Sequence, residues 1–195
     1  MSKGRLEAFS DGVIAIIITI MVLELKVPEH GTDLEALTPL IPVFLSYVLS
    51  FIFVGIYWNN HHHTFQAIKQ VDGRVLWPNL HLLFWLSMIP FATHWMGETG
   101  FAAWPVAVYG VVLLLCAVAY TILAVVLINI YGKDSAFGQA FGRDVKGKIS
   151  LAFYIPAIPL AFVSPWISCA LYVAVAVIWF IPDKRMERIM RPGAA

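Results

Sequence analysis

Long apolar runs separated by short polar segments dominate this chain. An α-helix needs about 20 apolar residues to cross the hydrocarbon core of a bilayer, and these runs are close to that length or longer. The pattern predicts six transmembrane helices, at residues 6–26, 39–65, 76–96, 104–131, 145–163 and 165–182. The last two are separated only by Ser164-Pro165. The surrounding apolar stretch, 149–181, is too long for one span, so we expect a tight hairpin there.

The composition agrees with a chain embedded in a membrane. Of its 195 residues, 60% are hydrophobic and 13% are charged, with a mean hydropathy of +0.79. A soluble domain of this length cannot bury so much apolar surface. We therefore expect an all-α polytopic membrane protein with one six-helix transmembrane domain over residues 1–195. The net charge of +1 indicates no nucleic-acid partner.

The charged residues are divided unevenly between the two ends of the predicted spans. With six spans, both termini and the loops at 66–75 and 132–148 share one side. That side holds nearly all the basic residues: Lys3, Arg5, Lys69, Arg74, Lys133, Arg143, Lys146, Lys148, Lys184, Arg185, Arg188 and Arg191. The other side has Lys26 with four acidic residues. Because cytoplasmic loops carry an excess of Lys and Arg, the sequence predicts that both termini are cytoplasmic.

The first span combines polar residues with a regular apolar stripe. On a wheel of 100° per residue, one seam follows an alternating spacing of four and three residues: Phe9, Gly12, Ile16, Thr19 and Leu23. Ile20 lies beside this seam. Asp11 and Ser10 lie roughly 130° from its centre, on opposite flanks, so they face something else.

Two interpretations of this stripe remain open from the pattern alone. Branched aliphatic residues one and two turns apart suit a central axis, where copies from several subunits form a dry constriction that gates by dewetting. In membrane helices, however, such a stripe more often contacts lipid or a neighbouring helix. The helix is apolar on nearly every side, so its periodicity does not choose between the two.

A motif at the start of this span adds a family resemblance. The pattern Arg5-x-x-x-Phe9-Ser10-Asp11, followed by Ile16 and Thr19, resembles the signature of the transmembrane protein 175 family. The predicted layout of six spans with both termini inside is similar as well. The family comprises potassium-permeable channels of animal endolysosomes and their bacterial relatives. A single six-span unit resembles the bacterial branch, which implies a homotetramer in the bacterial inner membrane.

The resemblance assigns roles to residues of the first span. It implies that this helix lines a central pore, with a hydrophobic constriction at Ile16, Ile20 and Leu23 and a selectivity role for Thr19. The alternative for Thr19 is that its hydroxyl only bonds back to the carbonyl of Ala15, as Ser and Thr in membrane helices often do. The resemblance also implies a structural network that ties the helix to its neighbours through the motif residues Arg5, Phe9, Ser10 and Asp11. Because the chain has no Thr-Val-Gly-Tyr-Gly segment, the carbonyl filter of ordinary potassium channels, we expect only a modest preference for potassium over sodium.

Polar residues near the cytoplasmic ends of the second and third spans are candidate partners for this network. They are Trp58, Asn59, Asn60, His61, His62, Trp77, Asn79 and His81. The run His61-His62-His63 also raises the question of a metal site. Adjacent helical residues point about 100° apart, so three consecutive histidines do not converge on one ion, and we expect no metal site.

The remaining expectations concern the class of protein. The sequence contains no nucleophile–base pair, phosphate loop or redox motif, so we expect neither an enzyme nor a cofactor, only a permeating potassium ion. The expected partners are a second copy of the chain, the lipid bilayer and monovalent cations. The alternatives are a secondary transporter, which Pro-broken spans permit although no internal repeat is visible, and a proton-permeable pathway.

Overall fold

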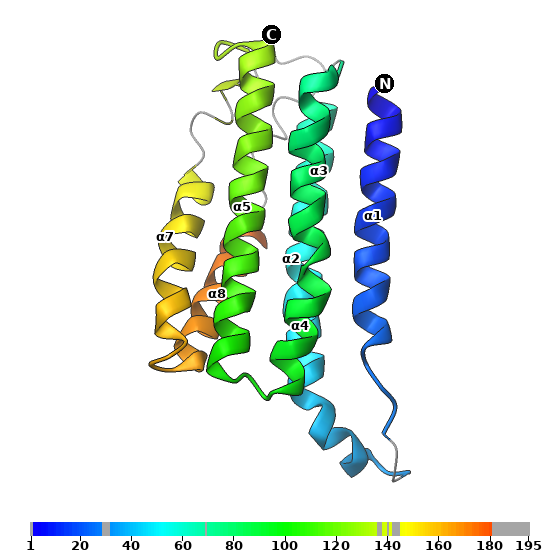
Figure 1. Cartoon of the computed structure of the whole chain (residues 1–195), viewed down its shortest axis with the longest axis vertical. Helices are drawn as coiled ribbons and strands as arrows, with labels where there is room; N and C mark the ends of the chain where they lie inside the picture. Colours follow the sequence, from blue (N-terminus) through cyan, green and yellow to red (C-terminus); the bar gives the residue numbers. More distant parts are fainter. Residues whose placement is uncertain are drawn as a thin grey trace.

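The chain folds into a bundle of membrane-length helices. The computed structural model describes residues 2–28, 32–68, 70–135, 138–139, 141 and 145–180. Within them the structure contains helices and no strand (Figure 1). The elements in chain order are α1 (Lys3–Leu23), the 3-10 helix η1 (Leu34–Leu40), α2 (Ile41–Gln66), α3 (Gly73–Ser87), α4 (Ile89–Glu98), α5 (Ala103–Tyr131), α7 (Val145–Leu160) and α8 (Pro165–Phe180).

Helices occur at all six predicted ranges, with their ends displaced by a few residues. The third span is divided into α3 and α4, which meet at Met88. Pro90, which follows this junction, has no N–H to donate and its ring clashes with the preceding turn, so it begins a new helix instead of continuing the old one. The predicted hairpin lies between α7 and α8, where Pro165 opens α8. The last two residues of the predicted span 165–182 lie outside the described residues.

By length and composition, four helical segments of the described chain can cross a membrane: α1, η1 with α2, α3 with α4, and α5. The two helices of the hairpin are shorter, at 16 residues each. Pro156 and Pro159 lie within α7, which remains helical through them.

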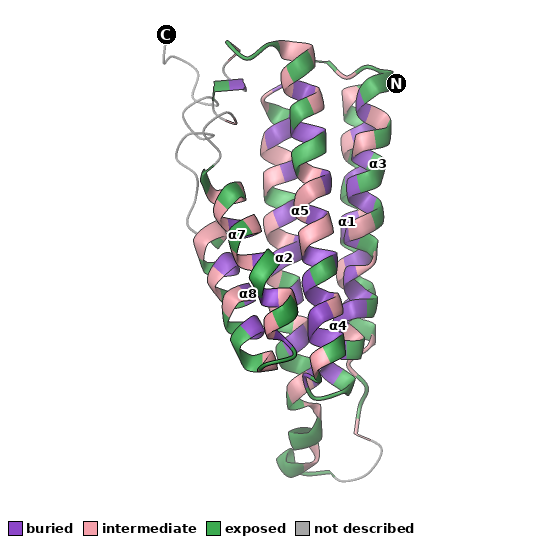
Figure 2. Cartoon of the chain, turned by 60° about the vertical axis from the view of Figure 1, so that its left-hand side comes forward, coloured by how far each residue is buried: buried purple, intermediate pink, exposed green. Residues whose placement is uncertain are grey.

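The bundle places α1 at one edge and the α7–α8 hairpin at the other (Figure 1). Helix α1 packs against α2, α3 and α4, whereas α5 lies between α3 and α7 and contacts both. Fully buried side chains such as Phe53, Leu82, Tyr109 and Leu123 fill the interior. In Figure 2 the buried positions run along the helix faces that meet inside the bundle, and the outer faces are exposed. An apolar exterior of this kind suits contact with lipid.

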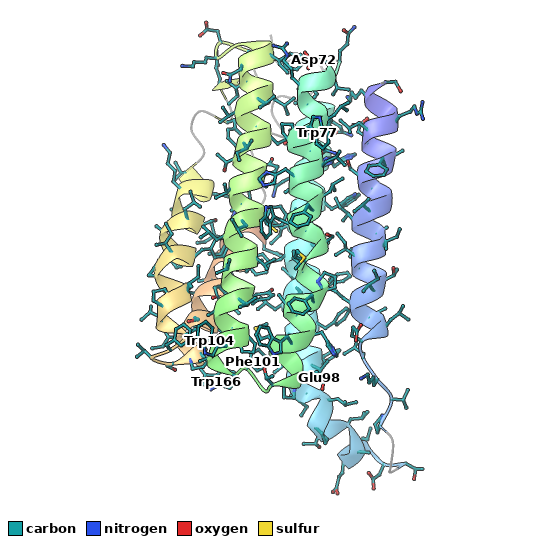
Figure 3. All side chains as sticks on the ribbon, in the orientation of Figure 1. Asp72, Trp77, Glu98, Phe101, Trp104 and Trp166 are labelled. Atoms are coloured by element: carbon teal, nitrogen blue, oxygen red, sulfur yellow. The ribbon has the colours of Figure 1, made fainter. Side chains whose placement is uncertain are left out.

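Aromatic side chains mark both ends of the bundle. Trp104 and Trp166 are 68% and 64% exposed and lie at the same end as Glu98, whereas Trp77, 78% exposed, lies toward the end that carries Asp72 (Figure 3). Tryptophan is enriched where a membrane meets water, so these positions indicate the two interfaces. The basic residues Lys3 and Arg74 belong to the Asp72 end, because α1 and α3 both begin there (Figure 1). The assignment of that end to the cytoplasm stays a prediction from charge.

Asp72 begins α3 in the manner of a helix cap. Its side chain accepts a hydrogen bond from the backbone N–H of Arg74 at 2.8 Å, and the Arg74 guanidinium also donates to it. The hydrogen bonds from Arg74 lower the pKa of the Asp72 carboxyl below its ordinary value, so the cap stays ionised at neutral pH.

Candidate functional site

Helix α1 has two opposed faces within the single chain. Its buried face is a stripe spaced three or four residues apart: Leu6, Ser10, Ile14, Ile17 and Met21. The predicted seam lies about 140° away around the helix, on the exposed side. There Ile16 is 58%, Ile20 42% and Leu23 77% exposed. Both stripes are mostly apolar, so the sequence periodicity does not show which of them is buried. The contacts of α1 with α2, α3 and α4 show it.

A buried chain of hydrogen bonds joins α1 to two other helices. Ser10 Oγ donates to the carbonyl of Leu6 at 2.9 Å and accepts from Asn79 Nδ2 of α3 at 2.9 Å. Asn79 Oδ1 in turn accepts from His61 Nε2 of α2 at 2.8 Å. The three side chains are at most 1% exposed. In the apolar interior these three side chains satisfy one another's hydrogen-bonding groups. The row of hydrogen bonds therefore fixes the rotation of α1 relative to the bundle.

Asp11 takes part in a different contact. Trp58 Nε1 of α2 donates to Asp11 Oδ1 at 3.0 Å, and the Trp58 ring stacks on His62. Trp58 is one of the predicted partners of the motif network, and Asp11 is exposed in the single chain. The reason is rotational: Ser10 occupies the middle of the buried stripe, and the next residue points 100° away from it.

The other two motif residues, Arg5 and Phe9, lie on the exposed side. Phe9 is 52% exposed. The Arg5 side chain makes no hydrogen bond or ion pair with the described part of the chain. The structure therefore brings Ser10 and Asp11 to neighbouring helices and does not bring Arg5 or Phe9 to them.

Both ends of α1 are also attached to the bundle. Near its start, Lys3 Nζ donates to the carbonyl of Ile68 at 2.9 Å, beyond the end of α2. At its other end, Glu24 Oε2 lies 3.3 Å from His94 Nδ1 of α4, which makes an ion pair when His94 is protonated. Glu24 and His94 fall at the same end of their predicted spans, which is the one signal in the sequence for this contact.

Thr19 lies on the exposed side of α1, one turn from Ile16. Its hydroxyl donates to the carbonyl of Ile16 at 2.9 Å. A hydroxyl that donates to the backbone keeps its lone pairs as acceptors for another group. The Thr19 hydroxyl is thus bonded within its own helix, and its oxygen can still accept a hydrogen bond on the exposed face.

The three consecutive histidines lie in different surroundings. His61 bonds to Asn79 and stacks on Phe65 with ring centroids 4.4 Å apart. His62 stacks on Trp58. In the described part of the chain, no group of three His, Cys, Asp or Glu side chains is placed to hold a metal ion.

A second buried polar cluster was not foreseen from the sequence. Thr93 Oγ1 of α4 lies 2.7 Å from Ser50 Oγ of α2, which is 3.0 Å from the hydroxyl of Tyr109 of α5. Isolated small polar residues within apolar runs are the available signal, but it does not tell which of them meet. This cluster lies in the interior of the bundle and holds α2, α4 and α5 together.

The fold and α1 together define a multi-pass helical membrane protein whose first helix is fixed to the bundle by one face and leaves an apolar face open. The sequence profile of the family "Endosomal/lysosomal potassium channel TMEM175" matches residues 5–90. A potassium channel of Chryseobacterium sp. (strain P1-3) is 56% identical over 191 residues, which cover 98% of this chain and 99% of that protein. The chain belongs to the TMEM175 family.

A solved structure and a vertebrate relative extend this comparison. The crystal structure of a lysosomal potassium-selective channel TMEM175 homolog from Chamaesiphon minutus has a TM-score of 0.79 at 28% identity, over 97% of this chain and 98% of that one. The endosomal/lysosomal proton channel TMEM175 of Gallus gallus is 35% identical over 103 residues, which are 47% of this chain and 21% of that protein. The match to the Gallus gallus protein is therefore confined to a part of each chain.

Proposed function

We propose that this protein is a potassium-permeable cation channel in which four copies of the chain surround one pore and α1 of each copy lines it. The observation that carries the proposal is the apolar stripe of α1, exposed at Ile16, Ile20 and Leu23 on the side opposite its buried stripe. In a membrane-spanning family with relatives named potassium channels, this face is available to line a path shared between subunits.

The proposed gate is a hydrophobic constriction. Four copies of Ile16, Ile20 and Leu23 around an axis present branched aliphatic side chains without hydrogen-bonding groups. A narrow passage of this kind excludes water. An ion does not enter it, because no polar group there replaces the water molecules of its hydration shell. Conduction then requires the helices to separate enough for the passage to fill with water.

The proposed selectivity element is a ring of Thr19 hydroxyls. Because each hydroxyl donates to the carbonyl of Ile16, its oxygen lone pairs are free to face a cation. Potassium holds its hydration water less tightly than sodium does, so a few neutral oxygens replace that water more readily for potassium. The preference from four oxygens is expected to be modest.

In this proposal the motif residues are structural. Ser10 holds α1 through Asn79 and His61, and Asp11 holds it through Trp58. Arg5 and Phe9, exposed in the single chain, are placed to contact a neighbouring copy. The channel lies in the bacterial inner membrane with both termini cytoplasmic, is not an enzyme and needs no cofactor besides the permeating ion.

Proton permeation is the second candidate function. It is favoured by the vertebrate relatives, which are named proton channels. A secondary transporter is the remaining alternative. The three possibilities differ in which ions move and in how fast they move.

Flux from proteoliposomes tests the proposal. Purified protein is reconstituted, and efflux of potassium, efflux of sodium and pH change are recorded in parallel, with the oligomer mass measured by native mass spectrometry. We expect potassium efflux faster than sodium efflux, at rates above transporter turnover, from an assembly of four chains. A proton flux without potassium flux, a slow saturable exchange or another subunit number would contradict it.

A further inference from the structure

A partly open cavity lies within the bundle, away from α1. It is surrounded by α2, α5, α7 and α8, and it leaves about 40 Å³ for the centres of water molecules. Its walls are largely aromatic and include Tyr57, Tyr120, Tyr154 and Trp179. No residue of α1 lines it, so it is separate from the proposed conduction path.

Two tyrosine hydroxyls at this cavity have no protein partner. Tyr57 and Tyr154 are 8% and 2% exposed, and neither hydroxyl makes a hydrogen bond with the described part of the chain. Among the described residues, neither hydroxyl oxygen is a fully buried atom without a partner, so both remain accessible to water. Two such groups beside one cavity indicate that something inside it supplies the missing bonds.

Other tyrosines of the bundle show how the chain satisfies this group. Away from the cavity, Tyr109 bonds to Ser50 and Tyr172 donates to the carbonyl of Val106. At the cavity wall, the Tyr120 hydroxyl lies 2.7 Å from Thr64 Oγ1. Tyr57 and Tyr154 therefore differ from these three tyrosines in having no such protein partner within the described part of the chain.

Further polar atoms at the wall complete a hydrogen-bonding environment. Asn60 donates its amide to the carbonyl of Ile56 at 2.9 Å, which leaves its side-chain oxygen as an acceptor. Ser150 Oγ accepts from Trp179 Nε1 at 2.8 Å and donates to the carbonyl of Lys146 at 2.9 Å. Among the described residues no carboxylate lines the cavity, so the chemistry of this lining suits a small neutral molecule that both donates and accepts.

We propose that this cavity is an internal water site, in which a cluster of water molecules bridges the hydroxyls of Tyr57 and Tyr154. A buried water needs roughly 10–15 Å³ of space for its centre and two to four polar partners. The cavity offers about 40 Å³ of such space, so about three molecules fit. The site gives each subunit a hydrated region within the membrane that is distinct from the proposed pore. It stabilises the packing of the α7–α8 hairpin on α2 and α5.

Hydroxyl-radical footprinting of the reconstituted channel tests this site. Short X-ray pulses generate radicals from bound water, and mass spectrometry locates the oxidised side chains. We expect Tyr154 to be oxidised several-fold faster than Tyr172, which is just as buried but bonded to backbone. Tyr154 is the decisive reporter, because Tyr57 is slightly more exposed. Equal protection of Tyr154 and Tyr172 would overturn the proposal.

A cavity-filling variant gives an independent result. Ala117 of α5 lines the cavity, and Ala117→Leu places three more carbon atoms at its wall. We expect the oxidation of Tyr154 to fall to the level of Tyr172 while the labelling of exposed Trp104 stays unchanged. Unaltered oxidation of Tyr154 in a folded Ala117→Leu protein would contradict a water site. The comparison of Tyr154 with Tyr172 in the wild-type chain stands even if this variant does not fold.

Discussion

At the scale of single residues, Ile16 and Thr19 present different chemistry on the same exposed side of α1. Ile16 offers only carbon, whereas Thr19 offers an oxygen acceptor because its proton is given to the Ile16 carbonyl. In the proposed channel Ile16 excludes water from the passage, whereas the Thr19 oxygen partly replaces the hydration water of the permeating ion. Single substitutions therefore separate the gate from the selectivity element.

Ile16→Asn is expected to increase the current. The amide wets the constriction, so the passage conducts more often, and the increase extends to sodium because the barrier to both ions falls. Planar-bilayer recording measures this. Val22→Asn is the matched control: Val22 is also exposed on α1, at 43%, but points to another side. An unchanged conductance in Ile16→Asn, with normal assembly, would rule out this seam as the gate.

Thr19→Val keeps the shape of the side chain and removes the oxygen. Reversal potentials in mixed potassium and sodium are expected to move toward no preference, with expression near that of the wild type. Thr121→Val is the control, since Thr121 is an exposed threonine of α5 whose hydroxyl likewise donates to a backbone carbonyl, that of Ala117. If the reversal potential of Thr19→Val equals that of Thr121→Val, the hydroxyl ring is not the selectivity element.

At the scale of helices, α1 is held by contacts of unequal burial. Asn79→Ala deprives buried His61 and Ser10 of a partner, so we expect a loss of about 1–3 kcal/mol. Asp11→Ala breaks an exposed bond to Trp58 and is expected to cost about 1 kcal/mol or less. Thermal unfolding of the purified variants in detergent measures both. A larger loss for Asp11→Ala than for Asn79→Ala would show that Asp11 is buried by a neighbouring copy.

The packing of α4 on α2 depends on a glycine. A Cβ built at Gly97 would lie 2.7 Å from the Cα of Val43, so Gly97→Ala requires the backbones to separate. We expect a loss of about 1–3 kcal/mol, the usual cost of overpacking. Gly55→Ala, where nothing lies within 4 Å, is expected to raise the melting temperature slightly, because alanine favours a helix over glycine. Equal melting temperatures of the two variants would contradict this close approach.

The sequence predicted the helices well because their boundaries depend on local chemistry. Apolar length set the spans, and the Pro residues set both the α3–α4 junction and the hairpin. The contacts of Ser10 with Asn79 and of Glu24 with His94 depend on how three spans are rotated and tilted together. Apolar runs of uniform hydrophobicity carry little information about that rotation, which is why the exposure of Asp11 was not foreseen.

At the scale of the whole molecule, the open face of α1 is apolar, so it can meet either lipid or another copy of the chain. Helix α1 contacts the bundle along one face and leaves Phe9, Ile16 and Leu23 open. The cavity beside Tyr154 lies in another part of the bundle, between α2, α5, α7 and α8. The proposed tetramer gives the open face of α1 a role, because it turns four separate stripes into the wall of one passage.

The exposure of Ile16 to the permeation path tests the central claim most directly. Silver ions are monovalent and bind thiolates tightly, and the native Cys116 and Cys169 are buried in the bundle. In proteoliposomes we expect silver to reduce the potassium flux of Ile16→Cys to background, while wild type and Val22→Cys keep their flux. A silver-resistant Ile16→Cys channel, or equal block of Val22→Cys, would contradict a pore lined by this face of α1.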